Sequence, residues 1–401
     1  MLRRILTIAL QLLIPFFSIA QSSANQDLNA GDKDVMDGIF HIIHKKTSTE
    51  DSVARRHQHI RIGMLPAIGY TLQTGFAALV SANVVIYNRR KKDSLLPSII
   101  FTSIAYTQKS QIILPFQSVI YFKHNLTMLI SDWRYLKYPS YTYGLGMHSK
   151  PSDENLLDFQ YFKFHESILF QLAPHIYAGG GYTLDYFWKV KEVHPKMDHV
   201  TDFEKYGYRE EEVSSGISVN LLRDTRDNPI NAYSGTYANI VLTPRFKFLG
   251  SDASWTTMLM EWRGYFRFPA RSSNILALWS YNWFTLGGKP PYLMLPSTAW
   301  DKSYNTGRGY IQGRFRSNNM LDAEAEYRIK LTKNGLLGMV LFGNLQRFSE
   351  NHAFRFETAA PAGGIGLRIK LNKYSRTNIS IDYGWGRQGS RGFFVNLGEI
   401  F

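Results

Sequence analysis

The sequence predicts an all-β chain, a transmembrane β-barrel of sixteen antiparallel strands. Aromatic and aliphatic residues recur at spacing two along most of the chain, and several of these runs reach the ~9–11 residues that a transmembrane strand needs. The number of runs is even, as single-chain bacterial barrels require. Of the 401 residues, 44% are apolar and only 19% are charged. The chain is therefore not disordered, and it has a large apolar surface to bury or to cover with lipid.

The alternation assigns two faces in the clearest runs. Between residues 321 and 330 every odd position is apolar, and every even position is ionisable: Asp322, Glu324, Glu326, Arg328 and Lys330. A soluble sandwich could show the same pattern, with the charged face toward water. Run length favours the membrane barrel, because the runs at 158–171, 174–190, 253–268 and 274–286 are well above the ~5–6 residues that are typical of globular strands.

The expected barrel occupies residues 61–401. Its strands are expected at 60–70, 75–87, 97–107, 111–122, 126–134, 158–171, 174–190, 211–224, 236–248, 253–268, 274–286, 318–330, 336–347, 362–372, 376–387 and 392–401. Alternate connections are short, and several of the others are long, at about 135–157, 191–210, 287–317 and 348–361. With a periplasmic N-terminus, the long connections are the extracellular loops.

The first twenty residues have the order of a secretory signal peptide. Arg3 and Arg4 precede an apolar stretch from residue 5 to 17, and small residues precede the expected cleavage after Ala20. The alternative, an N-terminal anchor, is disfavoured because the apolar run is shorter than the ~20 residues of a spanning helix. Residues 21–60 are expected to form a short periplasmic segment with one helix over Val35–Lys46.

Four local sequences are informative beyond the strand pattern. They are Asp224-Thr225-Arg226-Asp227-Asn228-Pro229 with Ser234-Gly235; Gly287-Gly288 leading to Gly307-Arg308-Gly309-Tyr310, Gly313-Arg314-Phe315-Arg316 and Glu326-Tyr327-Arg328; Gly363-Gly364-Ile365-Gly366-Leu367-Arg368; and Ile381-Asp382-Tyr383-Gly384 with Gly398-Glu399-Ile400-Phe401. In this order they resemble the BamA/TamA-type outer-membrane proteins, the bacterial surface antigen family. The motifs cover about 210–401, and the barrel pattern alone covers 60–210.

The resemblance implies that a long extracellular loop folds into the lumen of the barrel. Arg308 would be the arginine of the loop tip, completed by Gly309 and Tyr310, and acidic side chains of the inner wall would hold it. The inner-face candidates are Glu326, then Asp382, and also Glu324. An arginine fork gains most from a carboxylate in a confined, partly desolvated space.

Two further possibilities stay open for this loop. Related proteins often carry an aspartate in the strand after the one with Glu326, where this chain has Asn344, which can accept a hydrogen bond but has no charge. The alternative for Arg308 is an ordinary solvated arginine of a surface loop.

The run at 392–401 alternates through Phe393, Val395 and Leu397 to the aromatic Phe401. Such an ending has the form of the C-terminal signal of outer-membrane barrels. Glu399 interrupts the apolar face, and it is expected either at the aqueous rim or paired across the seam that closes the barrel.

The resemblance implies a protein of the cell outer membrane that assists the insertion or passage of polypeptides, or of lipids. Its expected partners are outer-membrane lipid, lipopolysaccharide and client polypeptides. The polypeptide-transport-associated (POTRA) domains of the family do not fit into residues 21–60, since each has the size of a small domain. The alternative function is a passive pore or structural barrel that keeps the family architecture.

No enzyme activity, metal or cofactor is expected. His165-Glu166 lacks the second histidine of a His-Glu-x-x-His zinc motif, and the chain has no cysteine for thiolate sites or disulfides. The 46 basic and 32 acidic residues give a net charge of +14. A cation-lined lumen and binding of anionic lipopolysaccharide account for this charge, so no nucleic-acid partner is expected.

Overall fold

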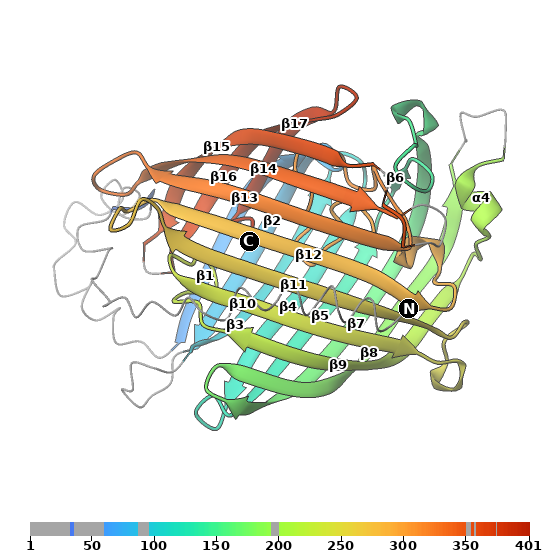
Figure 1. Ribbon diagram of the computed structural model, residues 1–401, viewed down its shortest axis with the longest axis horizontal. Coiled ribbons are helices and arrows are strands. Elements are labelled where there is room, and N and C mark those ends of the chain that lie inside the picture. The colour runs from blue at the N-terminus through green and yellow to red at the C-terminus, as the bar shows by residue number, and fades with distance from the viewer. Residues whose placement is uncertain are drawn as a thin grey trace.

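The computed structural model describes residues 33–35, 60–86, 96–193, 200–349, 354–356, 358–373 and 375–401 (Figure 1). The predicted signal peptide and nearly all of the predicted segment 21–60, with most of its helix over Val35–Lys46, lie outside these residues. Lys33 and Asp34 are described, and they contact two turns of the barrel. The amide of Lys33 donates to the Asn334 carbonyl at 2.8 Å, and Asp34 accepts from the Lys373 amide at 2.8 Å.

The described chain is almost entirely β-structure. The strands are β1 (Ile60–Thr71), β2 (Gly75–Ile86), β3 (Ser98–Thr107), β4 (Ile112–Phe122), β5 (Thr127–Lys137), β6 (Ser140–Thr142), β7 (Asn155–Ala173), β8 (Ile176–Glu192), β9 (Glu212–Asp224), β10 (Gly235–Arg245), β11 (Trp255–Arg267), β12 (Ile275–Gly287), β13 (Asn319–Lys330), β14 (Leu337–Phe348), β15 (Ala360–Asn372), β16 (Thr377–Gly386) and β17 (Arg391–Leu397). The helices are α4 (Asp202–Tyr206) and the 3-10 turns η2 (Pro151–Asp153), η3 (Lys247–Leu249) and η4 (Tyr292–Met294). Across the described ranges, no helix is long and apolar enough to cross a bilayer.

All seventeen strands belong to one sheet, and consecutive strands pair antiparallel. β5 and β6 both pair with β7, so together they occupy one position and the wall has sixteen positions. The break between them contains Pro139, which has no amide hydrogen to donate to a ladder. The predicted all-β antiparallel architecture is confirmed.

One predicted loop is shorter than expected. The connection expected at 135–157 begins later, because Tyr135, Leu136 and Lys137 continue β5 opposite Phe162, Tyr161 and Gln160. The short strand β6 follows β5, so only residues 143–154 form the connection to β7. The alternation of residue types in 135–137 is too short to reveal this extension.

Side chains alternate between the two faces of the wall. On β13 the even positions from Met320 to Arg328 are buried, whereas Ala323 and Ala325 are exposed. The inner face is therefore the ionisable one, as the period of two predicts. Many large apolar side chains are exposed on the outer face, as the lipid-facing surface of a barrel requires.

The two ends of the wall differ. At one end, named here the turn end, the connections are short, for example 123–126, 174–175 and 268–274. At the other, the loop end, lie 143–154, 193–211 and the longest connection, 288–318. Figure 1 shows β6 and α4 projecting at the loop end. Residues 288–318, named here the inner loop, are mostly buried.

The wall curls until its first and last strands lie side by side. A Cβ atom built on Gly69 of β1 would lie 3.6 Å from the Val395 carbonyl oxygen of β17. Since the strands are antiparallel, Leu397, the end of β17, reaches about the level of residue 67. Residues 60–66 of β1 extend beyond it, and in the described wall no ladder of paired residues joins β1 to β17.

The strand predicted at 392–401 ends early, at Leu397. Gly398 has φ of +110°, a backbone conformation that favours glycine, and it turns the chain into the lumen. Phe401 is buried, with its ring centroid 5.1 Å from that of Trp279. The prediction of Phe401 on the end of an alternating strand is therefore wrong, and alternation missed it because one glycine changes the direction of the chain.

Candidate functional site

The inner loop contains its own small hairpin. The Thr298 amide donates to the Phe315 carbonyl at 3.0 Å, and the Gly313 amide donates to the Thr298 carbonyl at 3.0 Å. Between these arms, Asp301 accepts hydrogen bonds at 2.8 Å from the amides of Asn305 and Thr306. The residues directly before the tip are therefore held in a hydrogen-bonded turn, and the tip begins from a fixed backbone position.

Arg308, at the tip of the inner loop, is fully buried against the inner wall. Its Nη2 lies 2.6 Å from Glu326 Oε1 of β13, and its Nη1 lies 2.6 Å from Asp382 Oδ2 of β16. Glu324 Oε2 is further away, at 3.6 Å. The guanidinium carbon also lies 4.0 Å from the centre of the Phe342 ring, so the side chain has an aromatic face on one side.

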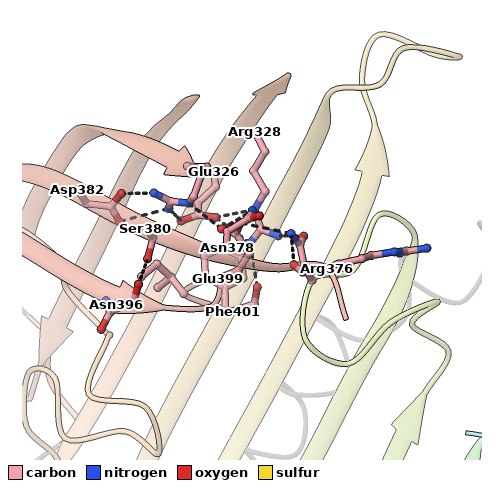
Figure 2. A network of polar contacts seen from close by, with 12 residues as sticks. Glu326, Arg328, Arg376, Asn378, Ser380, Asp382, Asn396, Glu399 and Phe401 are labelled. Atoms are coloured by element: carbon pink, nitrogen blue, oxygen red, sulfur yellow. Dashed lines mark hydrogen bonds and ion pairs between the residues drawn. The ribbon is translucent and has the colours of Figure 1, made fainter. Parts of the chain in front are cut away.

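The ion pairs of Arg308 belong to a larger set, named here the luminal cluster: Arg308, Glu324, Glu326, Arg328, Arg368, Asp382 and Glu399. Figure 2 labels Glu326, Arg328, Asp382 and Glu399 of this cluster. Arg328 Nη2 lies 2.8 Å from Glu326 Oε2. Arg368 pairs with Asp382, and its Nε lies 2.8 Å from Glu399 Oε2. Three arginines thus face four carboxylates, and each charge has an opposite neighbour, as buried charges require.

Glu399 takes neither of its two expected positions. It points into the lumen, where it pairs with Arg368 and accepts from Asn378 Nδ2 at 2.5 Å. Arg328 Nη2 donates to the Phe401 carbonyl at 2.8 Å, as Figure 2 shows. The turn at Gly398 carries residues 399–401 inward, and it therefore joins the seam side of the barrel to the luminal cluster.

Backbone groups of the tip are held as well as the Arg308 side chain. Asn344 Nδ2 donates to the Arg308 carbonyl at 2.8 Å, and Ser390 Oγ donates to the Gly309 carbonyl at 2.7 Å. The Tyr310 hydroxyl donates to the Pro361 carbonyl at 2.7 Å and accepts from the Arg387 amide at 2.9 Å. Asn344 thus contributes as a donor, a role that an aspartate could not fill.

Small residues make room for the tip. Gly309 has φ of +108°, and it packs against Gly384 of β16: a Cβ on Gly384 would lie 2.9 Å from the Gly309 Cα. A Cβ on Gly386 would lie 2.6 Å from the Tyr310 ring. These distances are too short for real contacts, so both glycines of β16 are needed for the tip to lie flat on the wall.

Two more arginines fix the arm that returns from the tip to β13. Arg314 donates to the Ser149 carbonyl at 2.7 Å and to Gln388, and it thus connects two other loops. Arg316 donates to the Tyr292 carbonyl at 3.0 Å. Burial lowers the pKa of Arg316. Burial also acts to lower the pKa of Arg308, but the nearby carboxylates of Glu326 and Asp382 have the larger effect, and the pKa of Arg308 is raised.

The arrangement restrains the inner loop against the wall of the barrel. Within the described residues, no group of three or more His, Cys, Asp or Glu side chains could hold a metal ion. Sequence reasoning named Arg308 and its acidic neighbours and quoted Gly384 within a motif, but it gave Gly384 no role and missed Asp301 and Gly386. The two glycines had a signal, because the alternation over 378–385, continued to residue 386, places both on the inner face. Asp301 had none, since a turn-forming aspartate is common in any loop.

A curled antiparallel wall with a buried loop defines the chain as a plugged β-barrel of the outer-membrane type. The model of the Omp85 superfamily domain matches residues 180–401, which is more than half of the chain. The chain therefore belongs to the Omp85 superfamily. No curated protein sequence matches it.

Solved structures show the same fold at low sequence identity. BamA from Haemophilus ducreyi lacking POTRA domains 1–3 aligns with a TM-score of 0.53 and 14% identity, over 85% of this chain and 69% of that one. CdiB from Escherichia coli aligns with a TM-score of 0.56 and 9% identity, over 85% and 62%. CdiB from Acinetobacter baumannii gives 0.52 and 10%, over 85% and 60%. The chain thus spans about three fifths of each CdiB chain.

Proposed function

We propose that the chain is an outer-membrane protein that helps polypeptide strands to insert into the membrane, and that insertion occurs at the seam between β1 and β17. The family assignment supports a role in protein insertion or translocation. The single observation that favours the seam is the length difference of its strands. β1 has twelve residues and β17 has seven, so within the described part of the chain residues 60–66 of β1 have no neighbouring strand on that side.

An unpaired strand edge is a template for another strand, because its amides and carbonyls have no partners in lipid. Ile62 and Met64 are 68% and 70% exposed, and the inward-facing Gly63 is exposed as well. A client strand can therefore add its hydrogen bonds to β1 by the same rule that builds the rest of the sheet.

The other expectations follow as parts of this proposal. The chain is not an enzyme and needs no cofactor; residues 1–20 direct export and are removed near Ala20. The outer wall contacts membrane lipid and, at the loop end, lipopolysaccharide. Arg308 and the luminal cluster hold the inner loop in place while the seam opens. The buried inner loop disfavours an open pore, because most of its side chains fill the space that a current would need.

A crosslink across the seam tests the proposal. Since the chain has no cysteine, Ile68→Cys and Val395→Cys can be joined with a short bis-maleimide. Val395 lies beside Gly69, and Ile68 is 75% exposed. The matched control joins Leu341→Cys and Ile365→Cys, which already face each other on β14 and β15. The assay is the folding of an unfolded eight-stranded barrel protein added to proteoliposomes.

We expect the seam crosslink to abolish the acceleration of client folding, and the β14–β15 crosslink to leave it unchanged. Equal activity of the two crosslinked proteins would contradict the seam as the site of insertion. If the uncrosslinked protein gives no acceleration but conducts a large, steady current in planar bilayers, the passive pore is the correct function.

A further inference from the structure

In the described wall, Glu166 of β7 is an acidic residue in the middle of the lipid-facing surface. The even positions of β7 point outward. Toward the turn end, Glu166 is followed on this face by Ile168, Phe170 and Leu172, and the last two are 55% and 69% exposed. Toward the loop end it is preceded by Phe164 and by the exposed Phe162. The carboxylate thus has apolar neighbours on both sides along its strand.

The other outward-facing charged side chains of the described strands lie near strand ends, where a barrel meets water and headgroups. They are Lys137, Asp158, Lys191, Arg223, Arg347 and Arg391. Asp158 and Lys191 also face each other at 4.0 Å. Glu166 differs from all of these in its depth in the apolar surface, and a charged group at that depth is costly.

The chain holds this carboxylate but does not neutralise it. Ser131 Oγ donates to Glu166 Oε1 at 2.9 Å, and Trp133 Nε1 donates to Oε2 at 2.9 Å. Ser118 Oγ lies 3.1 Å from Ser131 Oγ. All three are neutral groups. Among the described residues, no basic side chain lies within ion-pair distance of Glu166.

The surroundings form a polar band on the outer face. Glu166 is paired with Tyr182 of β8, whose hydroxyl lies 2.9 Å from Ser215 Oγ of β9. The indole of Trp133 stacks on Phe164, with ring centroids 5.2 Å apart, and this contact fixes its N–H toward the carboxylate. The outer band, Ser118, Ser131, Glu166, Tyr182 and Ser215, thus crosses five neighbouring positions of the wall.

We infer that the outer band is a docking site for a transmembrane segment of a partner protein, which presents a lysine or arginine to Glu166. A cation would supply the charge that the carboxylate lacks, and the bond would be charge-assisted in a medium without competing water. The serine hydroxyls beside Glu166 are buried and hydrogen-bonded within the wall, so they orient the carboxylate, and the contact with the partner is made by Glu166 itself. A second copy of this chain does not fit, because the outward basic residues of its described strands lie at strand ends and not at the depth of Glu166.

The test uses a synthetic transmembrane helix of about twenty leucine and alanine residues with one central arginine. The matched peptide has leucine at that position. Leu172→Cys, an exposed position of β7, carries a donor dye on the otherwise cysteine-free protein, and the peptides carry an acceptor. Energy transfer is measured in proteoliposomes as a function of the peptide-to-lipid ratio.

We expect half-maximal transfer at a peptide ratio about fivefold lower, or more, for the arginine peptide than for the leucine peptide. Glu166→Gln, which keeps the size of the side chain and one acceptor oxygen but removes the charge, should abolish this preference. Asp158→Asn, at the strand end, should leave it intact. An unchanged heat-modifiable gel shift verifies that each variant is folded.

Equal transfer for both peptides on the wild-type protein would overturn the inference, and so would a preference for arginine that survives in Glu166→Gln. Either result would mean that the carboxylate faces lipid without a cationic partner. The assay involves no client protein, so it is independent of the insertion activity proposed above.

Discussion

The wall of the barrel is held in two different ways in two neighbouring regions, the strands β13–β16 and the seam between β17 and β1. From β13 to β16, the inner loop is attached to every strand: to Glu326, Asn344, the Pro361 carbonyl and Asp382 in turn. At the seam, β1 and β17 lie side by side without a described ladder, and half of β1 has no neighbour there. We name β13–β16 the anchored wall.

The difference suggests a division within one ring of strands: the anchored wall is rigid, and the seam is the part that can open. Separating a buried ion pair is strongly destabilising, because each charge is then left buried without its partner. The anchored wall therefore resists deformation. The seam contains few polar contacts that must break, so it can open beside the anchored wall, whose strand β16 pairs with β17, while the anchored wall and the inner loop keep their geometry. The predictions below test this separation, beginning with the largest expected effect.

Removal of residues 289–306 of the inner loop should open the lumen. These residues include most of the side chains that occupy the interior, such as Tyr292 and Leu293, which are fully buried. We expect small, flickering single-channel currents for the wild-type protein and large, steady currents for the deletion. A large wild-type current that the deletion leaves unchanged would show that the loop does not close the lumen.

Arg308→Ala should destabilise the anchored wall by about 3–5 kcal/mol, because it leaves Glu326 and Asp382 buried without their shared cation. The measurement is the temperature at which the folded band disappears in a heat-modifiable gel shift. Arg209→Ala is the control, since Arg209 forms an exposed pair with Asp252 at 3.0 Å. Such a pair is worth about 0–1 kcal/mol. Equal shifts for the two variants would contradict a buried tether.

Gly384→Ala should cost about 1–3 kcal/mol, because the added methyl would overlap the Gly309 backbone and displace the tip. Gly287→Ala is the matched control at the end of β12, where an added Cβ meets nothing within 4 Å. We expect limited proteolysis of the inner loop in Gly384→Ala only. Protection of the loop in both variants would mean that the tip does not need the flat surface of β16.

Asn344→Ala should have the smallest effect, about 1 kcal/mol, since it removes one hydrogen bond to the Arg308 carbonyl. The ion pairs of Arg308 remain, so the single-channel currents should stay small. Asn344→Asp is informative beside it, because a carboxylate cannot donate to that carbonyl. A stabilising effect of Asn344→Asp would mean that the charge toward Arg308 matters more than the backbone contact.

The period of two predicted the strands and their inner faces closely, because lipid outside and a polar lumen inside impose it on every strand. The choice of Glu324, Glu326 and Asp382 as inner-face carboxylates followed from the same rule. It failed where one residue changes the direction of the chain: Gly398 sends Phe401 inward. It also failed at Asn344, since its role depends on a carbonyl that only the folded loop brings there.

The contacts of Arg308 also bear on the fidelity of folding. A strand that pairs one residue out of register turns its whole inner set of side chains to the outer face. If β13 or β16 slipped in this way, Glu326 or Asp382 would point to lipid, and the buried guanidinium would lose one of its two close counter-charges. The contacts of the inner loop are therefore complete only when the strands of the anchored wall pair in the correct register. Arg308 thus favours the correct register over a slipped one.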